Sequence, residues 1–471
     1  MNTASQLIGI APPIAVPVPT ARSALAVAGR QLRVRVLLLV MTCALPAMAL
    51  LAVGRLALAA NYFWGMFVVV STVLVIKRRH ETLLALLIGV TPLVNLLRGF
   101  GYAFYSMPLM VFAGVAVYYA IRAPQATMSV WRRCPLLVGL VAMAGVYYLL
   151  SLVNTGEYSR NLRMVEFCLG VYCVLLAGRN RFVLTAGLLG LIVSAGAVGI
   201  GLLPHNSDIG RLGIAVIEDN VVGNPVQLGL ALALGFLAIV VDRGHWLGLQ
   251  RSRFQKWLWL APVAVLLLLT TSRAAWLVAS GGVGLTALFG RGQRLKLLLV
   301  IVLVPLVLLA ALWSPFGPSL QAGLDRTFHS ERGLAGVTSG RSDQWAVAYQ
   351  AATTSWDRLL FGYGPGRGPT VYAKYSEQTG GVRYAVGQAV ELHSLFMQLQ
   401  VEAGLLGLTM FVVWLAVFLF RVAIGTRSSG RLFPLVCFCG YILSIATVSG
   451  NDTISGALLG IGLLGTLRRT T

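Results

Sequence analysis

The sequence predicts an all-α membrane protein, a polytopic bundle of about 12 to 14 transmembrane helices joined mostly by short connections. Hydrophobic residues make up 57% of the 471 residues, whereas charged residues make up only 11%. Apolar stretches recur from one end of the chain to the other, and each can cross a hydrocarbon core of roughly 30 Å. The alternating pattern of a transmembrane barrel is absent from the sequence, so helices are the predicted spanning elements.

The predicted spans can be placed one by one along the chain. They cover residues 36–53, 62–76, 82–97, 107–121, 135–153, 164–178, 182–203, 226–241, 257–271, 274–289, 296–313, 394–420, 432–449 and 453–467. Some of these stretches are short for a membrane crossing, so the expected total is a range and not one number.

These spans divide the chain into four regions. Residues 1–35 form a tail rich in Pro and Ala that is expected to be cytoplasmic and disordered. A first group of helices covers 36–313, a long outward loop covers 314–392, and a last group of helices covers 393–471. The tail lacks the apolar core and cleavage site of a signal peptide, so we expect the first span to remain as an anchor.

The positive charge belongs to one set of connections. With the N-terminus in the cytoplasm, the segments on that side hold 24 of the 37 Lys and Arg residues and only two acidic residues, Glu81 and Asp242. They therefore carry the whole net charge of +22, as the positive-inside bias predicts. The excess indicates topology and not nucleic-acid binding, and it predicts that both termini are cytoplasmic. The longer connections, at 154–163, 204–225 and 314–392, then face outward.

The spacing of candidate ligands predicts neither a metal nor a cofactor. The outward segments hold no Asp-x-Asp pair and no histidine cluster of the kind that binds metal ions. The cysteines lie in or beside predicted spans without metal or disulfide spacing, so we expect them to be packing residues. They are Cys43, Cys134, Cys168, Cys173, Cys437 and Cys439.

The long loop contains a candidate interfacial helix. Between Arg341 and Leu360 apolar residues recur at helical spacing, which predicts an amphipathic helix lying on the membrane surface. These residues are Trp345, Ala348, Ala352, Trp356 and Leu359. The stretch "FGYGPGRG" that follows ends the helix, because its glycines and proline force a turn. A loop of this length without a core of its own is typical of a lid or a binding element.

Three polar residues at the outward ends of spans are the first candidates for chemistry, because polar groups at membrane depth are costly. Arg273 lies at the outer tip of an apolar hairpin, and Arg211 precedes a Gly-Asn-Pro turn that leads into a span. His393 begins the helix that follows the long loop. Gln400, seven residues later, falls on the same helical face as His393, so that face could line a cavity.

Each candidate also has a purely structural explanation. Arg273 could extend to lipid headgroups, and His393 could cap a helix by bonding a carbonyl. Arg211 could pair with one of the nearby acidic residues, Asp208, Glu218 or Asp219. Glu391 and Glu402 are candidate partners of His393, although Glu402 projects to the opposite side of the helix.

Together the two arginines and the histidine suit transfer from a diphosphate. Guanidinium groups grip a diphosphate with paired, charge-assisted hydrogen bonds and stay charged at any relevant pH. An imidazole with a near-neutral pKa can take the proton of a sugar hydroxyl as that oxygen attacks. A diphosphate whose charge is balanced by arginine leaves readily, so this chemistry needs neither a general acid nor a metal.

The order of the motifs resembles the O-antigen ligase and polymerase superfamily. In sequence they are Arg211 before Gly223-Asn224-Pro225, then Ser272-Arg273-Ala274, Gly340-Arg341 with Trp345, Gly362 to Gly366, and "H-S-L-F…E-x-G-x-x-G" from His393 to Gly407. They cover about residues 210 to 410, whereas the preceding spans agree in hydropathy only. One position departs from the family pattern, because Ser394 stands where the family more often has Asn.

The resemblance implies a GT-C type membrane glycosyltransferase of the bacterial inner membrane, with its active site on the periplasmic side. Such enzymes take a glycan from an undecaprenyl diphosphate carrier. Ligases pass it to a sugar of lipid A–core, and polymerases pass it to another carrier-linked unit. The family pattern implies that Arg211 and Arg273 bind the diphosphate and that His393 activates the acceptor. We expect Arg341 to bind the diphosphate as well, and the supporting residues to be Glu391, Gln400, Gly364 and Gly366.

The sequence therefore predicts an inverting, metal-independent glycan transferase, an O-antigen ligase in a lipid bilayer. One alternative is a polymerase of O-antigen or exopolysaccharide units that uses the same active site. Another is a transporter or flippase for lipid-linked sugars, although the chain lacks the two related halves that are common in transporters. A structural scaffold is disfavoured, because it would not need outward arginines.

Overall fold

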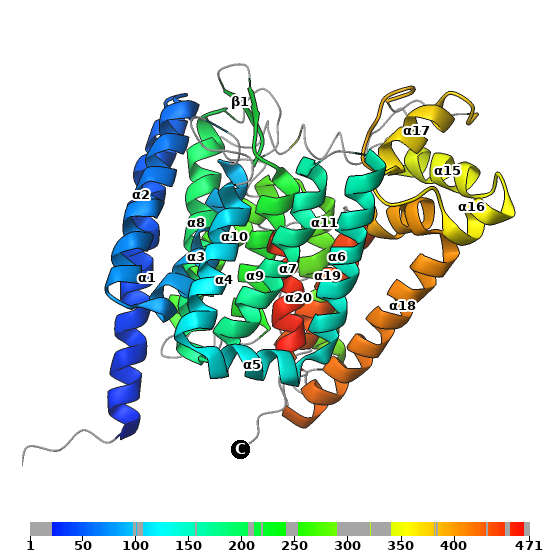
Figure 1. The fold of residues 1–471 in the computed structure, drawn as a ribbon. Coiled ribbons are helices and arrows are strands. Elements are labelled where there is room, and N and C mark those ends of the chain that lie inside the picture. Colours follow the sequence, from blue (N-terminus) through cyan, green and yellow to red (C-terminus); the bar gives the residue numbers. More distant parts are fainter. Residues whose placement is uncertain are drawn as a thin grey trace, which may run out of the picture.

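The computed structural model describes residues 21–97, 100, 107–155, 158–205, 212–217, 220–241, 253–289, 321, 341–380, 382, 385–429, 432–447 and 453–465. Almost all of these residues are helical, and the helices pack side by side as a bundle with a smaller group of helices at one end (Figure 1). The only strands in these ranges are β1 (Ala215–Ile217) and β2 (Asn220–Val222), which pair as an antiparallel hairpin.

The helices follow the predicted spans closely. In chain order they are α1 (Ala21–Ala52), α2 (Leu56–Ile76), α3 (His80–Leu96), α4 (Met107–Arg122), α5 (Pro124–Arg133), α6 (Pro135–Thr155), α7 (Tyr158–Gly178), α8 (Arg181–Leu202), the 3₁₀ turn η1 (Leu203–His205), α9 (Pro225–Val240), α10 (Arg253–Leu269), α11 (Arg273–Phe289), α15 (Arg341–Ala352), α16 (Trp356–Phe361), α17 (Gly368–Ser376), α18 (Leu395–Ser429), α19 (Phe433–Thr447) and α20 (Thr453–Leu464). Each predicted span overlaps one of these helices, except 296–313, which lies outside the described residues.

The fold is that of a helical membrane protein, as predicted. Four described helical segments are long and apolar enough to cross a membrane alone: Val27–Ala52, Leu56–Ile76, Arg181–His205 and Leu395–Thr426. The bent pair α4 and α5 could supply a fifth, and the other apolar helices are shorter. Among the shorter ones, α9 and α20 are buried on nearly all sides, so neighbouring helices rather than lipid surround them.

Two connections differ from the sequence prediction. The segment 154–163 was expected to be an outward loop, but α6 continues to Thr155 and α7 begins at Tyr158. The basic stretch after Arg122 was expected to be a simple connection. It forms α5 instead, which is bent by 107° from α4. Pro124 starts α5, since a proline at the first helical position fits the fixed φ and leaves no amide without a partner.

Small residues allow α1, α3 and α8 to pack closely against one another. A Cβ atom built on Gly89 would lie 3.3 Å from the Cα of Gly190, and one on Gly190 would lie 3.0 Å from the Cα of Gly89. The Ser194 hydroxyl donates to the Gly89 carbonyl at 2.5 Å. Such small-residue interfaces let helix backbones approach each other where no water is present to drive association.

The cysteines contribute to packing. All six are free, and five of them are buried in the structure. This arrangement agrees with the expectation from their spacing.

The described part of the long loop has a hydrophobic core of its own, which the sequence did not suggest. This loop core consists of Val347, Ala348, Ala351, Val371, Tyr372, Leu392 and Val401. It joins α15 and α17 to the beginning of α18. The described residues between 341 and 392 therefore pack together at one end of the bundle (Figure 1).

The single amphipathic helix predicted over 341–360 is divided into two. The helical path stops after Ala352, and α16 begins at Trp356. The buried face of α15, which includes Val347 and Ala348, packs into the loop core and not onto a lipid surface. Large apolar side chains remain exposed on both helices, since Tyr349 of α15 is 65% exposed and, on α16, Trp356 is 79% exposed and Phe361 is 64% exposed.

A break in α18 separates a short first segment from a long second one. Gly404 has φ 65° and ψ −169°, which no α-helix contains. The short segment lies across the end of the bundle, and the long one runs obliquely to the other end (Figure 1).

We expect Gly190→Val to lower the stability of the bundle by about 1–3 kcal/mol, the usual cost of adding atoms to a packed core. The added Cβ would lie 3.0 Å from backbone of α3 and 3.1 Å from the Val40 side chain. Thermal unfolding of the purified protein in detergent measures the effect. Gly114→Val is the matched control, because a Cβ at Gly114 meets no atom within 4 Å. Equal stability of the two variants would contradict the close packing.

Candidate functional site

The described segments that carry candidate residues lie at one end of the bundle, which we call the loop end. It carries the β1–β2 hairpin, α15 to α17, and the first residues of α9, α11 and α18, whereas α5 lies at the opposite end (Figure 1). The loop end therefore combines segments that are far apart in the sequence.

Arg273 is the first residue of α11 and follows a tight turn from α10. Thr271 in this turn has φ 45°, an unfavourable conformation for a β-branched residue. The turn is held by internal hydrogen bonds, since the Thr270 hydroxyl donates to the Leu267 carbonyl at 2.7 Å and the Ser272 hydroxyl accepts from the amide of Ala275 at 3.4 Å. The backbone direction at Arg273 is thus fixed by the turn.

The chain that contains Arg211 reaches the same turn. Arg211 itself lies outside the described residues. The next residue, Leu212, is buried, and its amide donates to the Leu269 carbonyl of α10 at 3.0 Å. The backbone directly after Arg211 is therefore bound to the end of the helix that leads to Arg273.

The Gly-Asn-Pro turn closes the segment that follows Arg211. Gly223 has φ 90°, and a Cβ there would lie 2.4 Å from the Gly213 carbonyl oxygen, so only glycine fits. Asn224 caps α9, because its side-chain oxygen accepts from the amides of Val226 and Gln227. Pro225 is the first residue of α9, where a proline is favoured. The motif is explained by backbone geometry alone.

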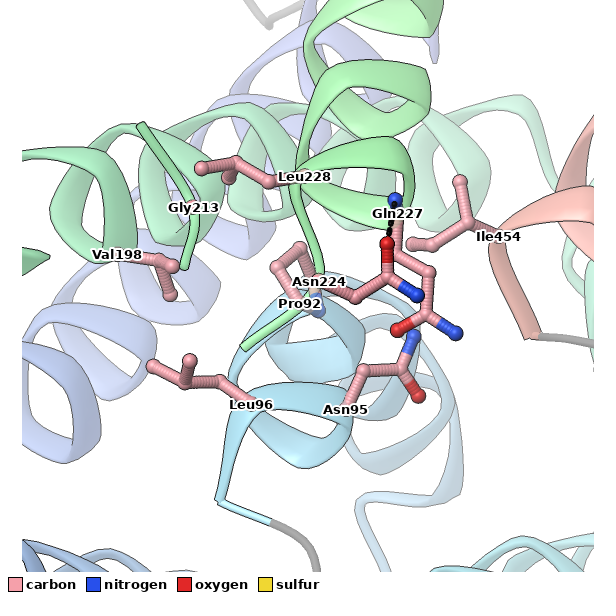
Figure 2. Close-up of a pocket in the computed structure, with 9 residues that line it drawn as sticks. All are labelled: Pro92, Asn95, Leu96, Val198, Gly213, Asn224, Gln227, Leu228 and Ile454. Atoms are coloured by element: carbon pink, nitrogen blue, oxygen red, sulfur yellow. Dashed lines mark hydrogen bonds between the residues drawn. The ribbon is translucent and has the colours of Figure 1, made fainter. Parts of the chain in front are cut away.

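A small cavity lies behind this turn (Figure 2). It is lined by Pro92, Asn95, Leu96, Val198, Gly213, Asn224, Gln227, Leu228 and Ile454. The side-chain amides of Asn95 and Gln227 face the same space (Figure 2). The cavity volume is about 20 Å³, enough for one water molecule and too small for a sugar or a diphosphate. The cavity therefore does not form a substrate site.

His393 does not begin a helix, contrary to the sequence prediction. The helix α18 starts at Leu395, so His393 lies in the non-helical residues before it. Because His393 precedes the helix, it does not share a helical face with Gln400, contrary to the prediction. His393 is positioned instead by its two buried neighbours, Leu392 and Ser394.

Two further candidates lie around His393. The side-chain amide of Gln344, which is fully buried, donates to the Glu391 carbonyl at 3.1 Å and fixes the backbone next to the histidine. Burial lowers the pKa of His393, the positive charge of Arg341 lowers it further, and Glu391 partly opposes the shift. The structure thus brings Arg341, Glu391 and His393 into one electrostatic environment, although they are separated by up to 52 positions in the sequence.

Gly364 and Gly366 have their amides bound inside the protein. Both have positive φ, at 99° and 81°. The Gly364 amide donates to the Glu402 carbonyl and the Gly366 amide to the Glu402 carboxylate, both at 2.9 Å. These amides therefore hold the turn and are not free to bind a phosphate.

Glu402 was expected only as a candidate partner of His393, and Tyr147 was not among the predicted site residues. The carboxylate of Glu402 is 1% exposed and accepts hydrogen bonds from Tyr147 of α6 and from the glycine turn. The pattern "E-x-G" downstream of "G-Y-G-P-G" was the available signal for Glu402. Nothing in the pattern around Tyr147 distinguishes it from other tyrosines in apolar spans.

The chemistry available at the loop end is proton transfer beside positive charge. A histidine with a lowered pKa is neutral at physiological pH and has a free electron pair for a proton. Arg341 close to it can bind an anion without losing its own charge. Among the described residues no three His, Cys, Asp or Glu side chains are placed to hold a metal ion.

Comparison with known proteins finds one family model that matches the part of the chain with these residues. Residues 258–412 match the family model described as O-Antigen ligase. The match covers less than half of the chain, from α10 to the long segment of α18, and includes Arg273, Arg341 and His393. No curated protein matches the chain. This match supports the resemblance to the O-antigen ligase and polymerase superfamily that the order of the motifs indicated.

We expect His393 to react with diethylpyrocarbonate, which modifies only the neutral imidazole, at pH values below the ordinary histidine pKa of 6.5. Arg341→Gln should raise the pKa of His393, because it removes the positive neighbour while burial remains, so modification at low pH should decrease. Mass spectrometry of the His393 peptide measures both profiles. Arg358→Gln on α16 is the control and should leave the profile unchanged. An unchanged profile in Arg341→Gln would show that the two groups do not interact.

Proposed function

We propose that this member of the O-antigen ligase and polymerase superfamily transfers a glycan from an undecaprenyl diphosphate carrier to a sugar of lipid A–core. The observation that carries the proposal is the environment of His393, a partly buried imidazole of lowered pKa near the charge of Arg341 at the loop end. Arg273 starts a helix at the same end, and the backbone after Arg211 is bound to its turn. A neutral base and several guanidiniums are the groups that this reaction needs.

In the proposed reaction the acceptor hydroxyl oxygen attacks the anomeric carbon of the carrier-linked glycan. The new carbon–oxygen bond forms as the bond to the diphosphate oxygen breaks, and the electron pair of that bond leaves with the diphosphate. The hydroxyl proton passes to the ring nitrogen of His393. Attack from the face opposite the leaving group inverts the anomeric centre.

The arginines act on the leaving group. Arg211, Arg273 and Arg341 would balance the negative charge that develops on the diphosphate as the bond breaks, and that is the point at which electrostatic stabilisation contributes most to the rate. Guanidiniums suit this role because they match the geometry of phosphate oxygens and cannot lose their proton. In this scheme the leaving group needs neither a metal ion nor a proton donor.

The distribution of Lys and Arg indicates which side of the membrane the active site faces. The excess of Lys and Arg lies in the connections of the opposite side, which supports a cytoplasmic location for both termini and a periplasmic location for the loop end. The carrier-linked donor would then reach His393 from the outer leaflet of the inner membrane.

We expect His393→Ala to reduce glycan transfer by about 10²- to 10⁴-fold, the usual contribution of a general base, without weakening carrier binding. The assay mixes purified protein with carrier-linked glycan and lipid A–core and identifies the product by mass. His205→Ala is the matched control. His205 also lies at the loop end, but its ring nitrogen is hydrogen-bonded to the Leu51 carbonyl at 2.9 Å. Transfer retained in His393→Ala would remove the proposed base.

Arg273→Ala should instead weaken binding of the carrier diphosphate, which is measured directly with a labelled carrier in the absence of acceptor. The same assay with a second carrier-linked unit in place of lipid A–core distinguishes a ligase from a polymerase, because only the acceptor differs. Product with lipid A–core alone identifies a ligase. Product with the second carrier-linked unit alone identifies a polymerase and overturns the ligase assignment.

A further inference from the structure

We propose that Glu402 is a positioning residue, whose buried carboxylate ties the glycine turn and α6 to the start of α18 and thereby holds His393 in place for transfer. The inference rests on the proposed function for its activity readout. It goes beyond that function by assigning a role to Glu402 and Tyr147, to which the proposed reaction gives none.

The first support is the number of hydrogen bonds that the Glu402 carboxylate accepts. One oxygen, Oε2, accepts from the Gly366 amide at 2.9 Å and from the Tyr147 hydroxyl. The other, Oε1, accepts from the Gly368 amide at 3.0 Å and from the Gln398 side chain at 3.3 Å. Four donors thus surround a carboxylate that is only 1% exposed. Both oxygens are engaged, so Glu402 is poorly suited to act as a base itself.

The second support is the backbone around the break in α18. In a continuous helix the carbonyls of Val401 and Glu402 would accept from amides four residues later. The break at Gly404 releases them, and they accept instead from the amides of Tyr363 at 2.8 Å and Gly364 at 2.9 Å. The glycine turn is therefore bound to α18 by its backbone as well as by the carboxylate.

The third support is the closeness of the two backbones. A Cβ at Gly362 would lie 2.6 Å from the Glu402 carbonyl carbon, and a Cβ at Gly404 would lie 2.3 Å from the Leu360 carbonyl oxygen. A Cβ at Gly368 would lie 2.8 Å from the Glu402 carboxylate. Glycines at these positions are explained by contact between the turn and α18, without any contact to substrate.

The fourth support connects this contact to His393. Leu392, the residue before the histidine, packs in the loop core with Val401, and its side chain approaches Gly368. On the other side, the Ser394 carbonyl accepts from the Gln398 amide at 2.9 Å in the first turn of α18. The backbone of His393 is thus held on both sides. Leu392 packs beside the residues that bind Glu402, and Ser394 bonds Gln398, whose side chain donates to the Glu402 carboxylate.

The fifth support is the connection to the bundle. Tyr147 belongs to α6, and its hydroxyl is also within 3.2 Å of the Gln398 side-chain amide. Through this residue the loop and the short segment of α18 are fixed relative to a transmembrane helix. Removing the carboxylate would leave the Gly366 and Gly368 amides and the Tyr147 hydroxyl without their acceptor, which is costly for buried donors.

The test compares Glu402→Gln with Glu377→Gln in the full-length protein. Glu377 is a matched control because it lies in the same loop at the end of α17 and is exposed. In Glu402→Gln we expect kcat to fall by about 10- to 100-fold while the Kd for the carrier stays within about twofold, because small displacements of a reacting group reduce the rate strongly. Amide hydrogen exchange at Gly366 and Gly368 should accelerate, and the diethylpyrocarbonate profile of His393 should shift towards pH 6.5 as its burial decreases.

Tyr147→Phe is the second variant, because it removes one donor and leaves the carboxylate in place. It should produce the same changes to a smaller extent, and the double variant should be no worse than Glu402→Gln alone. This variant keeps the inference testable if Glu402→Gln does not fold.

Three outcomes would overturn the inference. These are a normal kcat in Glu402→Gln, an equal loss in Glu377→Gln, or a loss of carrier affinity that matches the loss of kcat. Failure of the proposed function looks different. If His393→Ala transfers glycan normally while Glu402→Gln still accelerates amide exchange and shifts the His393 profile, the tie through Glu402 stands and the assignment of His393 as base falls.

Discussion

At Gly404 the chain leaves the helical path of α18, and the carbonyls of Val401 and Glu402 lose the amides that a continuous helix would give them. The amides of Tyr363 and Gly364 replace them, and the Glu402 carboxylate takes the amides of Gly366 and Gly368. This exchange satisfies the polar backbone of a glycine turn that is packed against a helix end. The arrangement of the whole loop end depends on it, because the loop core, α16 and the residues around His393 all contact these two segments.

The bundle and the loop end are stabilised by different interactions. In the bundle the helices meet through small residues, and α3 and α8 approach until the backbones at Gly89 and Gly190 touch. The backbone N–H and C=O groups of a helix are hydrogen-bonded within the helix, so such close packing is compatible with an apolar environment. At the loop end the backbone is irregular and has to be bonded by other segments. Glycines therefore occur in both places, for contact between helices in one and for positive φ in the other.

The environment of His393 follows from the same construction. The loop core buries Leu392, and Gln344 fixes the carbonyl of Glu391, so the histidine is held partly buried near the charge of Arg341. Both effects lower its pKa and favour the neutral imidazole that a base requires. Arg273 belongs to a separate rigid turn, which the chain after Arg211 joins through one backbone hydrogen bond. The candidate site is thus assembled from a turn between helices and a packed loop.

The sequence by itself determined the membrane class, the positions of nearly all helices, and the resemblance that a family match over residues 258–412 supports. These follow from local properties, namely the length of apolar stretches and the order of short motifs. Tertiary structure alone decided that residues 341–360 form two helices, of which α15 packs into a loop core, that His393 precedes α18, and that Glu402 binds the glycine turn. The reason is physical. Whether an apolar face meets lipid or protein, and which donor reaches a buried carboxylate, depends on residues hundreds of positions away, as with Tyr147 and Glu402, and no local pattern records such contacts.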